Sequence, residues 1–114
     1  MSIHNLPFQL WEARQKIVKS ATVALRADEV DHSSIKGDTA AGAVALTLPA
    51  GAHDYDGFEV EFINSGANTL TIICAAGFGG GGAGKANIVL AQGELARVRC
   101  RDANWYSEHH TAPA

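Results

Sequence analysis

From residue 20 onward, apolar and polar residues alternate in short runs that are separated by turn residues. Residues 59–63 alternate between glutamates and apolar side chains, and Val44, Leu46 and Leu48 share one face of an earlier run. A period of two is typical of strands that bury one face. The connections between the runs are too short for crossover helices, so we expect mainly antiparallel sheets.

The pattern as a whole predicts an all-β fold. Seven or eight short strands would form a small antiparallel β-sandwich or barrel with a jelly-roll-like architecture. A chain of 114 residues has room for one such domain. The expected strands cover residues 22–26, 33–37, 44–48, 59–63, 69–74, 88–90, 96–100 and 105–106.

We divide the chain into an N-terminal docking arm (residues 1–19), a β-domain (20–108) and a flexible C-terminal tail (109–114). Residues 5–19 are compatible with a helix that Asn5 would cap, and an extended arm is the alternative. A helix this short is marginal in water, so it needs a surface to pack on. That surface would belong to its own domain, to a neighbouring subunit or to a larger partner.

Four apolar side chains of the arm are candidate contacts with that partner. Phe8, Leu10 and Trp11 lie close together in the sequence, and Ile17 continues a loose apolar stripe. A polar, disordered arm would not carry such a cluster. We therefore expect these residues to bind a larger assembly, with packing on the arm's own domain as the alternative.

The charge balance and the N-terminal sequence argue against several classes of partner. Nine basic and twelve acidic side chains give a net charge of -3, whereas a nucleic-acid-binding protein would have a basic excess. No run approaches the roughly 20 apolar residues of a membrane span. Residues 1–10 lack the basic start and apolar run of a signal peptide. We expect neither nucleic acid nor a membrane as a partner.

The two cysteines, Cys74 and Cys100, fall on the apolar faces of predicted strands. A chain without a secretion signal is expected to keep its thiols reduced. Free cysteine behaves as a small apolar residue, and one pair of cysteines does not make a zinc motif. We therefore predict two buried free thiols.

Residues 79–85 (GGGGAGK) match the G-x-x-x-x-G-K pattern of a phosphate-binding loop. Such a loop continues with Ser or Thr and with a helix whose N-terminus faces the phosphates. Here Ala86 follows, and residues 86–90 have the pattern of a strand. Because consecutive glycines permit close approach of backbone segments, we predict a flexible or close-packed loop instead of a nucleotide site.

Three further clusters hold residue types that carry chemistry elsewhere. His53, Asp54 and Asp56 form one candidate metal set and residues 108–110 (Glu-His-His) another, but neither has a recognised ligand spacing. Residues 28–33 contain the aspartate, histidine and serine of a hydrolytic triad. Neighbours this close in sequence rarely reach triad geometry. We expect no metal, no other cofactor and no enzymatic activity.

The outward faces of two predicted strands carry opposite charges at matching spacing. Glu59 and Glu61 alternate with apolar residues on one strand, and Arg97, Arg99 and Arg101 do so on the other. Such residues could form a solvated charged face, or the strands could pair across a sheet or across a subunit interface. If the domain is oligomeric, we expect its subunit contacts at these residues.

The order of the runs resembles a bacteriophage structural module. A strand ending in "LP" (residues 43–51, AVALTLPAG) is followed by residues 56–72 (DGFEVEFINSGANTLTI), which contain a "G-x-x-V-x-x-x-N" strand and an "N-T-V-T-I"-like strand. After a glycine-rich stretch, residues 88–106 (IVLAQGELARVRCRDANWY) match the closing "G-x-x-x-x-V-x-x-x-x-x-x-W" segment. The resemblance covers residues 22–106. It implies a virion protein that is usually trimeric, and it carries over no catalytic residue.

We therefore expect a capsid decoration (cement) or head-fibre protein. It would be made in the host cytoplasm, bind the major capsid protein of the assembled shell through its arm, and stabilise the shell as a homotrimer. The alternative is a tail-fibre or baseplate module that binds a host-surface glycan near Trp105 or His53, although Trp105 and Tyr106 more often belong to a core or an interface. A small cupin-like enzyme is a third class, but it needs a metal cluster that the histidines do not provide.

Overall fold

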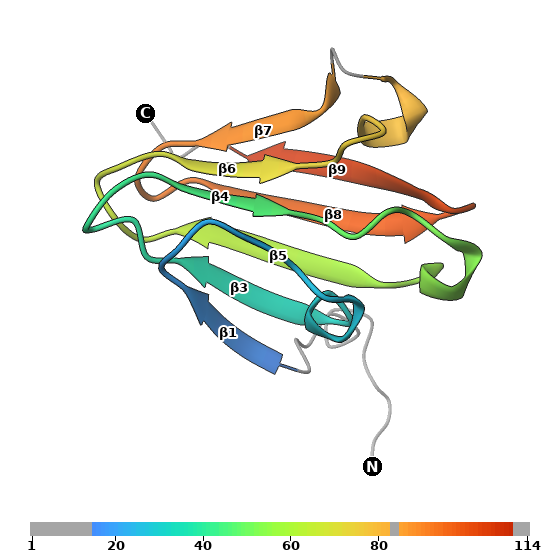
Figure 1. The fold of residues 1–114 in the computed structure, drawn as a ribbon, viewed down its shortest axis with the longest axis horizontal. Coiled ribbons are helices and arrows are strands. Elements are labelled where there is room, and N and C mark those ends of the chain that lie inside the picture. The colour runs from blue at the N-terminus through green and yellow to red at the C-terminus, as the bar shows by residue number, and fades with distance from the viewer. Residues whose placement is uncertain (1–14, 83–84, 111–114) are drawn as a thin grey trace.

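The computed structural model describes residues 15–82 and 85–110, which form two β-sheets (Figure 1). Within those residues the chain has nine strands and three single-turn 3-10 helices. The five-stranded sheet has the order β1-β3-β5-β8-β9, and the four-stranded sheet has the order β2-β4-β6-β7. The strands are β1 (Gln15–Lys19), β2 (Val23–Ala24), β3 (Ser33–Gly37), β4 (Val44–Thr47), β5 (Glu59–Asn64), β6 (Leu70–Ile73), β7 (Asn87–Leu90), β8 (Leu95–Arg101) and β9 (Asn104–His110). The helices are η2 (Ala27–Glu29), η3 (His53–Tyr55) and η4 (Phe78–Gly80).

The all-β fold predicted from the alternation is confirmed, but the strand directions differ from the prediction. The pairs β1–β3, β2–β4, β3–β5 and β4–β6 are parallel. The pairs β5–β8, β6–β7 and β8–β9 are antiparallel. Both sheets are therefore mixed, and the prediction of antiparallel, jelly-roll-like sheets is wrong.

The parallel pairs arise because the chain changes sheet after each of its first five strands. Between β3 and β5, for example, β4 carries the chain back in the other sheet, so that β3 and β5 run in the same direction. A parallel pair needs a crossover of about a dozen residues or more. A strand of the opposite sheet supplies that crossover here, which is why short connections between strands do not exclude parallel pairing.

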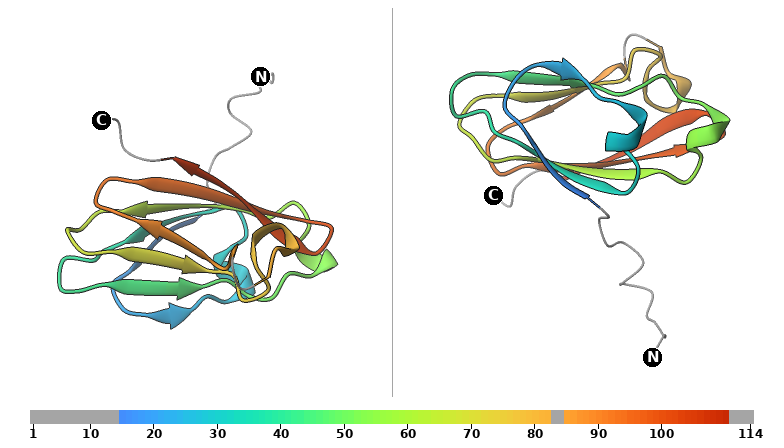
Figure 2. Two further views of the ribbon diagram at one scale, coloured as in Figure 1. Left: turned by 90° about the horizontal axis from the view of Figure 1, so that it is seen from above. Right: turned by 60° about the horizontal axis from the view of Figure 1, so that its bottom comes forward.

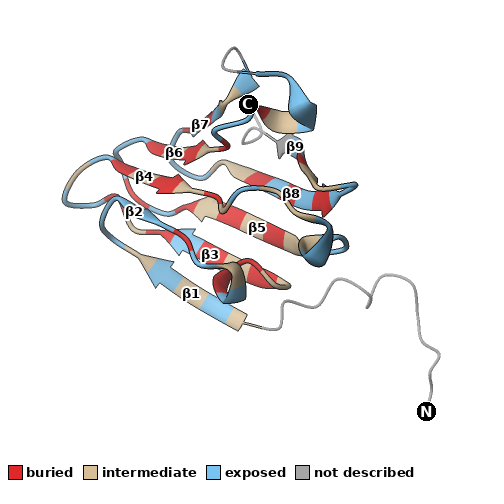
Figure 3. Ribbon diagram, turned by 45° about the vertical axis from the view of Figure 1, so that its right-hand side comes forward, coloured by how far each residue is buried: buried red, intermediate tan, exposed pale blue. Residues whose placement is uncertain are grey.

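The two sheets lie as facing layers that enclose one apolar core (Figure 2). Among the described strands, neither sheet closes on itself. Buried residues alternate with partly buried ones along β5 and mostly with exposed ones along β8, as the period of two predicts (Figure 3). Both cysteines are buried and free, as predicted. The largest buried apolar side chains are Trp105, Phe62, Ile35, Leu46, Leu70, Ile72 and Leu90.

Residues 15–19 form the edge strand β1 and not the end of a helix. Ile17 is partly buried and packs against the core, so it belongs to the β-domain and not to a free arm. The helical alternative is therefore wrong for these residues, because β1 gains a full register of partners along β3. The other predicted anchors, Phe8, Leu10 and Trp11, lie outside the described residues.

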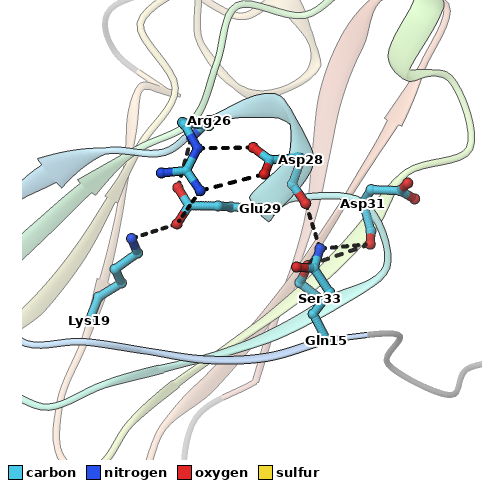
Figure 4. A network of polar contacts seen from close by, with 7 residues as sticks. All are labelled: Gln15, Lys19, Arg26, Asp28, Glu29, Asp31 and Ser33. Carbon is cyan, nitrogen blue, oxygen red and sulfur yellow. Dashed lines mark hydrogen bonds and ion pairs between the residues drawn. The ribbon is translucent and has the colours of Figure 1, made fainter.

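A polar network holds β1 and the segment around η2 together (Figure 4). The Gln15 side-chain amide donates to the Ser33 hydroxyl over 3.0 Å, and the Lys19 ammonium lies 2.6 Å from the buried Glu29 carboxylate. Burial opposes the ionisation of Glu29, but the Arg26 backbone N–H and the Lys19 ammonium outweigh it, so its pKa is lowered. This network explains why an edge strand of five residues stays attached to the domain.

At one end of the sheets, three side chains form a hydrogen-bonded cluster that we call the hub: Thr39, Asn64 and Asn68. The Thr39 hydroxyl donates to the Asn64 side-chain oxygen over 2.8 Å, and the Asn68 amide donates to the Thr39 carbonyl over 2.7 Å. The Asn64 amide also donates to the carbonyls of Asn68 and Leu90. A Cβ at Gly66 would lie 2.5 Å from the Thr39 hydroxyl, so only glycine fits there. The hub thus joins three separate loops in one network, whose members Thr39 and Asn64 are buried and whose member Asn68 is exposed.

The opposite end, which we call the helix end because η2, η3 and η4 lie there, is closed around Trp105 (Figure 1). The indole is 1% exposed and donates to the Pro49 carbonyl over 2.8 Å, which confirms its prediction as a core residue. The β8–β9 turn contains Asp102 and Ala103, both with positive φ. The Ala103 N–H donates to the Asp56 carboxylate over 2.9 Å. That hydrogen bond holds the turn against η3.

The C-terminal strand extends further than predicted, because β9 pairs with β8 as far as His110. The predicted start of the flexible tail at residue 109 is therefore too early, because residues 109 and 110 belong to β9. Residues 111–114 lie outside the described part of the chain. No helix among the described residues is long and apolar enough to cross a membrane.

Candidate functional site

The outer side of the five-stranded sheet carries most of the charged side chains singled out in the sequence. Residues in register on neighbouring strands share a face of the sheet, so these side chains form rows across the strands. The first row is Ser34, Glu61, Arg97 and Glu108, and the second row is Glu59, Arg99 and Tyr106. We call this surface the charged face. Its central members are Ser34, Glu59, Glu61, Arg97, Arg99, Arg101, Tyr106 and Glu108.

The acidic and basic strands pair within one chain. Glu59 lies opposite Arg99 and Glu61 lies opposite Arg97 in the β5–β8 register. The Arg97 guanidinium is 3.7 Å from the Glu61 carboxylate, which also accepts a hydrogen bond from the Ser34 hydroxyl over 3.1 Å. Pairing across a sheet, one of the arrangements that the sequence left open, therefore accounts for the matching spacing. Exposed pairs of this kind contribute about 0.2–1 kcal/mol each.

The second row of the charged face is less fully paired than the first. Arg99 stands between Glu59 on β5 and Tyr106 on β9, yet its guanidinium lies 3.6 Å from the Glu108 carboxylate. Within the described residues, the Glu59 carboxylate has no hydrogen bond or ion pair, and neither has Arg101 at the end of β8. The second row therefore keeps hydrogen-bonding capacity that the first row has used.

A hollow of about 210 Å³ opens between these two rows. Its walls are the side chains of both rows, and the buried Val60 and Val98 lie beneath it in the sheet. Tyr106 is 43% exposed and borders a second, more open depression beside Arg101. The walls of the first hollow come from Glu59, Arg97, Arg99, Tyr106, Ser107 and Glu108.

The residues of the candidate triad do not form one. Asp31 lies 2.8 Å from the His32 ring, but Ser33 is fully buried. The Ser33 hydroxyl is hydrogen-bonded to the Gln15 amide and not to the imidazole. A nucleophile needs its base within hydrogen-bonding reach, so this arrangement does not activate the serine.

The candidate metal residues have local structural partners. The His53 ring lies 3.2 Å from the Asp56 carboxylate, and the other oxygen of Asp56 accepts the Ala103 N–H. That backbone hydrogen bond, together with His53, lowers the pKa of Asp56 despite partial desolvation. Within the described residues, no group of three or more histidines, cysteines or acidic residues is placed to hold a metal ion.

Among the described residues, no α-helix follows the glycine-rich loop. Residues 77–82 pack on themselves through backbone hydrogen bonds, among them Gly82 to the Ala76 carbonyl over 3.0 Å. The next element is the strand β7, as the sequence predicted. A Cβ placed on Gly79 would lie 3.6 Å from the Tyr106 ring. The described part of the loop therefore packs beside Tyr106 at the edge of β9.

Comparisons with known proteins add a fold but not a family. No family model matches the chain, and no curated protein matches it. The crystal structure of the StcE fragment 132–251 of enterohemorrhagic E. coli is similar over 82% of this chain and 88% of that chain, with a TM-score of 0.50 and 16% sequence identity. A likeness at this identity shows the all-β fold alone.

Sequence reasoning found the charged residues but missed the hollow between them. The sequence groups Tyr106 with Trp105 as one aromatic pair, but the two neighbours point to opposite faces of β9, one buried and one exposed. The signal was present in the alternation itself, since a residue next to a core tryptophan on a strand must face outward. No comparable sequence pattern indicates that β1, β3 and β5 are parallel.

Proposed function

We propose that this protein is a bacteriophage capsid decoration or head-fibre protein that binds the assembled shell and stabilises it as a homotrimer. The major capsid protein is its proposed partner, and the capsid surface is its proposed location. The observation that carries the proposal is the attachment of β1: the strand lies at the edge of the five-stranded sheet, held by Gln15 and Lys19. The apolar cluster of Phe8, Leu10 and Trp11 precedes this firmly held strand in the sequence.

The proposed mechanism is stoichiometric binding. A protein that binds only the assembled shell stabilises that state by mass action. Phe8, Leu10 and Trp11 are the proposed anchors. Ile17 is assigned to the domain, because its side chain packs on the domain's own core.

We also propose that the two facing layers form a β-sandwich whose edges take part in trimer contacts. Within the described residues, β1 and β9 end one sheet and β2 and β7 end the other. Open edges present unpaired backbone groups that another chain can pair with, and a closed threefold assembly would cover them. Of the charged residues predicted for subunit contacts, Glu59 and Arg101 are the ones without an ion pair in the described chain.

The test is co-sedimentation of the protein with assembled shells of the phage that encodes it. We expect the full chain to pellet with shells, and the triple variant Phe8→Ala, Leu10→Ala, Trp11→Ala to stay in the supernatant. Removal of residues 1–14 should have the same effect, whereas removal of residues 1–19 would also take away β1 and confuse binding with folding. Lys36→Ala, at an exposed position of the inner strand β3, is the control and should bind normally. Unchanged pelleting of the triple variant would contradict the proposal.

One of the two glycan-binding positions predicted for the tail-fibre alternative is not accessible to a glycan. Trp105 is enclosed in the core and its indole N–H is hydrogen-bonded to Pro49, so it offers no surface to a sugar. His53 is exposed on η3 and pairs with Asp56. Neither position lies at the hollow of the charged face.

A further inference from the structure

We propose that the hollow of the charged face binds a neutral saccharide unit, with Tyr106 as a stacking platform and Glu59, Arg99 and Glu108 as hydrogen-bonding groups. This site is separate from the apolar anchors of the shell-binding segment. The two proposals therefore rest on different residues and can fail independently.

The size of the hollow suits one ring-sized group. Its volume of about 210 Å³ lies below the roughly 300 Å³ at which sites for drug-sized ligands begin. The sheet forms its floor, and side chains from β5, β8 and β9 form its walls. Sites built on strands hold their side chains more firmly than sites built on loops. A single sugar ring, alone or as part of a longer chain, would fit between the two rows.

The groups around the hollow have hydrogen-bonding capacity that the described chain does not use. The Glu59 carboxylate is half-buried and accepts no hydrogen bond there, although Arg99 stands directly opposite. The Tyr106 hydroxyl likewise has no partner among the described residues. Among the described residues, the Arg99 guanidinium has only its 3.6 Å contact with Glu108, which is longer than a hydrogen bond. A ligand with several hydroxyl groups would satisfy these donors and acceptors together.

The charges of the walls select for a neutral ligand. Glu59 and Glu108 are balanced by Arg97 and Arg99, so the lining has no net charge. An anion or a cation would meet as many like charges as opposite ones and would gain no net attraction from this lining. Vicinal hydroxyls suit such a lining, because each hydroxyl both donates to a carboxylate and accepts from a guanidinium.

The Tyr106 ring supplies the apolar part of the site. It is 43% exposed, and the glycine-rich loop packs beside it, with Gly79 as its neighbour. A tyrosine in this setting presents an apolar ring together with a polar hydroxyl. The C–H face of a sugar ring can stack on the aromatic ring while its hydroxyls reach the charged side chains. A site with both features should bind a sugar better than a small polar molecule that lacks an apolar face.

The test is a titration of the ¹⁵N-labelled full chain, followed by NMR, with the neutral methyl glycosides of glucose, galactose, mannose and N-acetylglucosamine. We expect saturable shifts for at least one glycoside, confined to β5, β8 and β9, with a dissociation constant on the order of 1 mM. Tyr106→Ala should weaken binding at least roughly tenfold, about 1.4 kcal/mol. Tyr106→Phe, which keeps the ring, should weaken it less, and Glu59→Gln should weaken it without unfolding the chain. Val89→Ala, at an exposed position of the other sheet, should bind as the unchanged protein does.

Three outcomes would overturn the inference: no saturable shift with any of the four glycosides, shifts centred away from the hollow, or binding that survives Tyr106→Ala. Tighter binding of glucuronic acid or of an acidic peptide than of every neutral glycoside would also overturn it. The balanced charges of the lining would then not determine which ligand binds. The Tyr106→Ala protein should still pellet with assembled shells. Loss of saccharide binding is thereby distinguished from failure of the shell-binding proposal.

Discussion

The two ends of this molecule are closed by different means. At the hub end, three loops meet at Thr39, Asn64 and Asn68: the buried Thr39 and Asn64 side chains bond each other, and the exposed Asn68 side chain bonds the Thr39 backbone. At the helix end, the loops rest on one large aromatic side chain, Trp105, and on a turn that is held by Asp56. Both ends have to seal the gap between two layers of strands.

The difference matters because buried hydrogen bonds and aromatic packing restrict the chain in different ways. A satisfied buried network fixes the positions of all its members, and it is costly to open. Packing on one aromatic ring leaves the surrounding backbone freer, and the helix end contains the positive φ angles of Asp102 and Ala103 together with the glycine-rich loop. The hollow beside Tyr106 is lined by the middle of β8 and β9 and by the start of β5. We infer that the hub end is the more rigidly fixed of the two and that the helix end opens locally more readily.

The largest expected effect comes from removing the aromatic that closes the helix end. Trp105→Ala deletes a side chain that is 1% exposed and should lower the free energy of unfolding by about 3–5 kcal/mol. Denaturant unfolding of the two proteins measures the difference. Tyr106→Ala is the matched control on the outer face of the same strand, and it should cost far less. Equal losses for the two variants would break the distinction between the inner and outer faces of β9.

At the hub end, Asn64→Ala should destabilise the protein through lost hydrogen bonds. It leaves the Thr39 hydroxyl, the Gly66 N–H and the Leu90 carbonyl without their side-chain partner. A buried polar group left unsatisfied costs about 1–3 kcal/mol. Asn87→Ala, at an exposed position of β7, is the control. A loss in Asn64→Ala no greater than that of the control would show that the hub is not needed for closure.

A gain in stability is expected at the strained turn of the helix end. Ala103 has a φ of 64°, a conformation that costs a residue with a Cβ about 1–2 kcal/mol and costs glycine little. Part of the benefit is offset because glycine loses more freedom on folding, so Ala103→Gly should stabilise the protein by roughly 0.5–1 kcal/mol. Thermal unfolding would show a raised Tm. Ala75→Gly, an exposed turn alanine without positive φ, should lower the Tm instead.

The smallest expected effect is a dependence on pH at the same turn. The hydrogen bond from the Ala103 N–H holds the pKa of Asp56 below its usual value, so its stabilising contribution is present above the unfolded value of about 3.9. It is lost as the pH falls through the lower, folded-state pKa. The Tm difference between the unchanged protein and Asp56→Asn should therefore be largest near neutral pH and shrink below about pH 4. A difference that grows toward acid pH would contradict the role given to Asp56.

The alternation of apolar and polar residues in the sequence predicts the positions of most strands. The strands from β3 to β8 lie within a residue or two of their expected bounds, because a period of two and flanking turn residues are local signals. Their pairing is not local. The same runs fit antiparallel sheets or a chain that crosses between two layers, and the direction of β3 beside β5 depends on where β4 packs. Residues 15–19 have a helix-compatible composition, but the tertiary pairing with β3 makes them a strand.

The candidate site was predictable in its charges and not in its shape. The matching spacing of Glu59, Glu61, Arg97 and Arg99 indicated two strands that pair, and they do. The hollow depends on Arg99 lying nearer Glu108 than Glu59, which is a side-chain choice that no spacing specifies. The hub was hidden for a similar reason. Residues 64–68 have the composition of an ordinary turn, and nothing in that composition indicates that Asn64 is buried against Thr39 of another loop.

The division between a fixed hub end and a more open helix end is tested most directly by amide hydrogen exchange under native conditions. The account predicts that the N–H groups of Asn64 and Gly66, which bond to Glu94 and to the Asn64 side chain, exchange only when the whole domain unfolds. The N–H groups of Gly80, Gly82 and Ala103 should exchange much faster, through local opening. Equal protection at the two ends, or faster exchange at the hub, would contradict it.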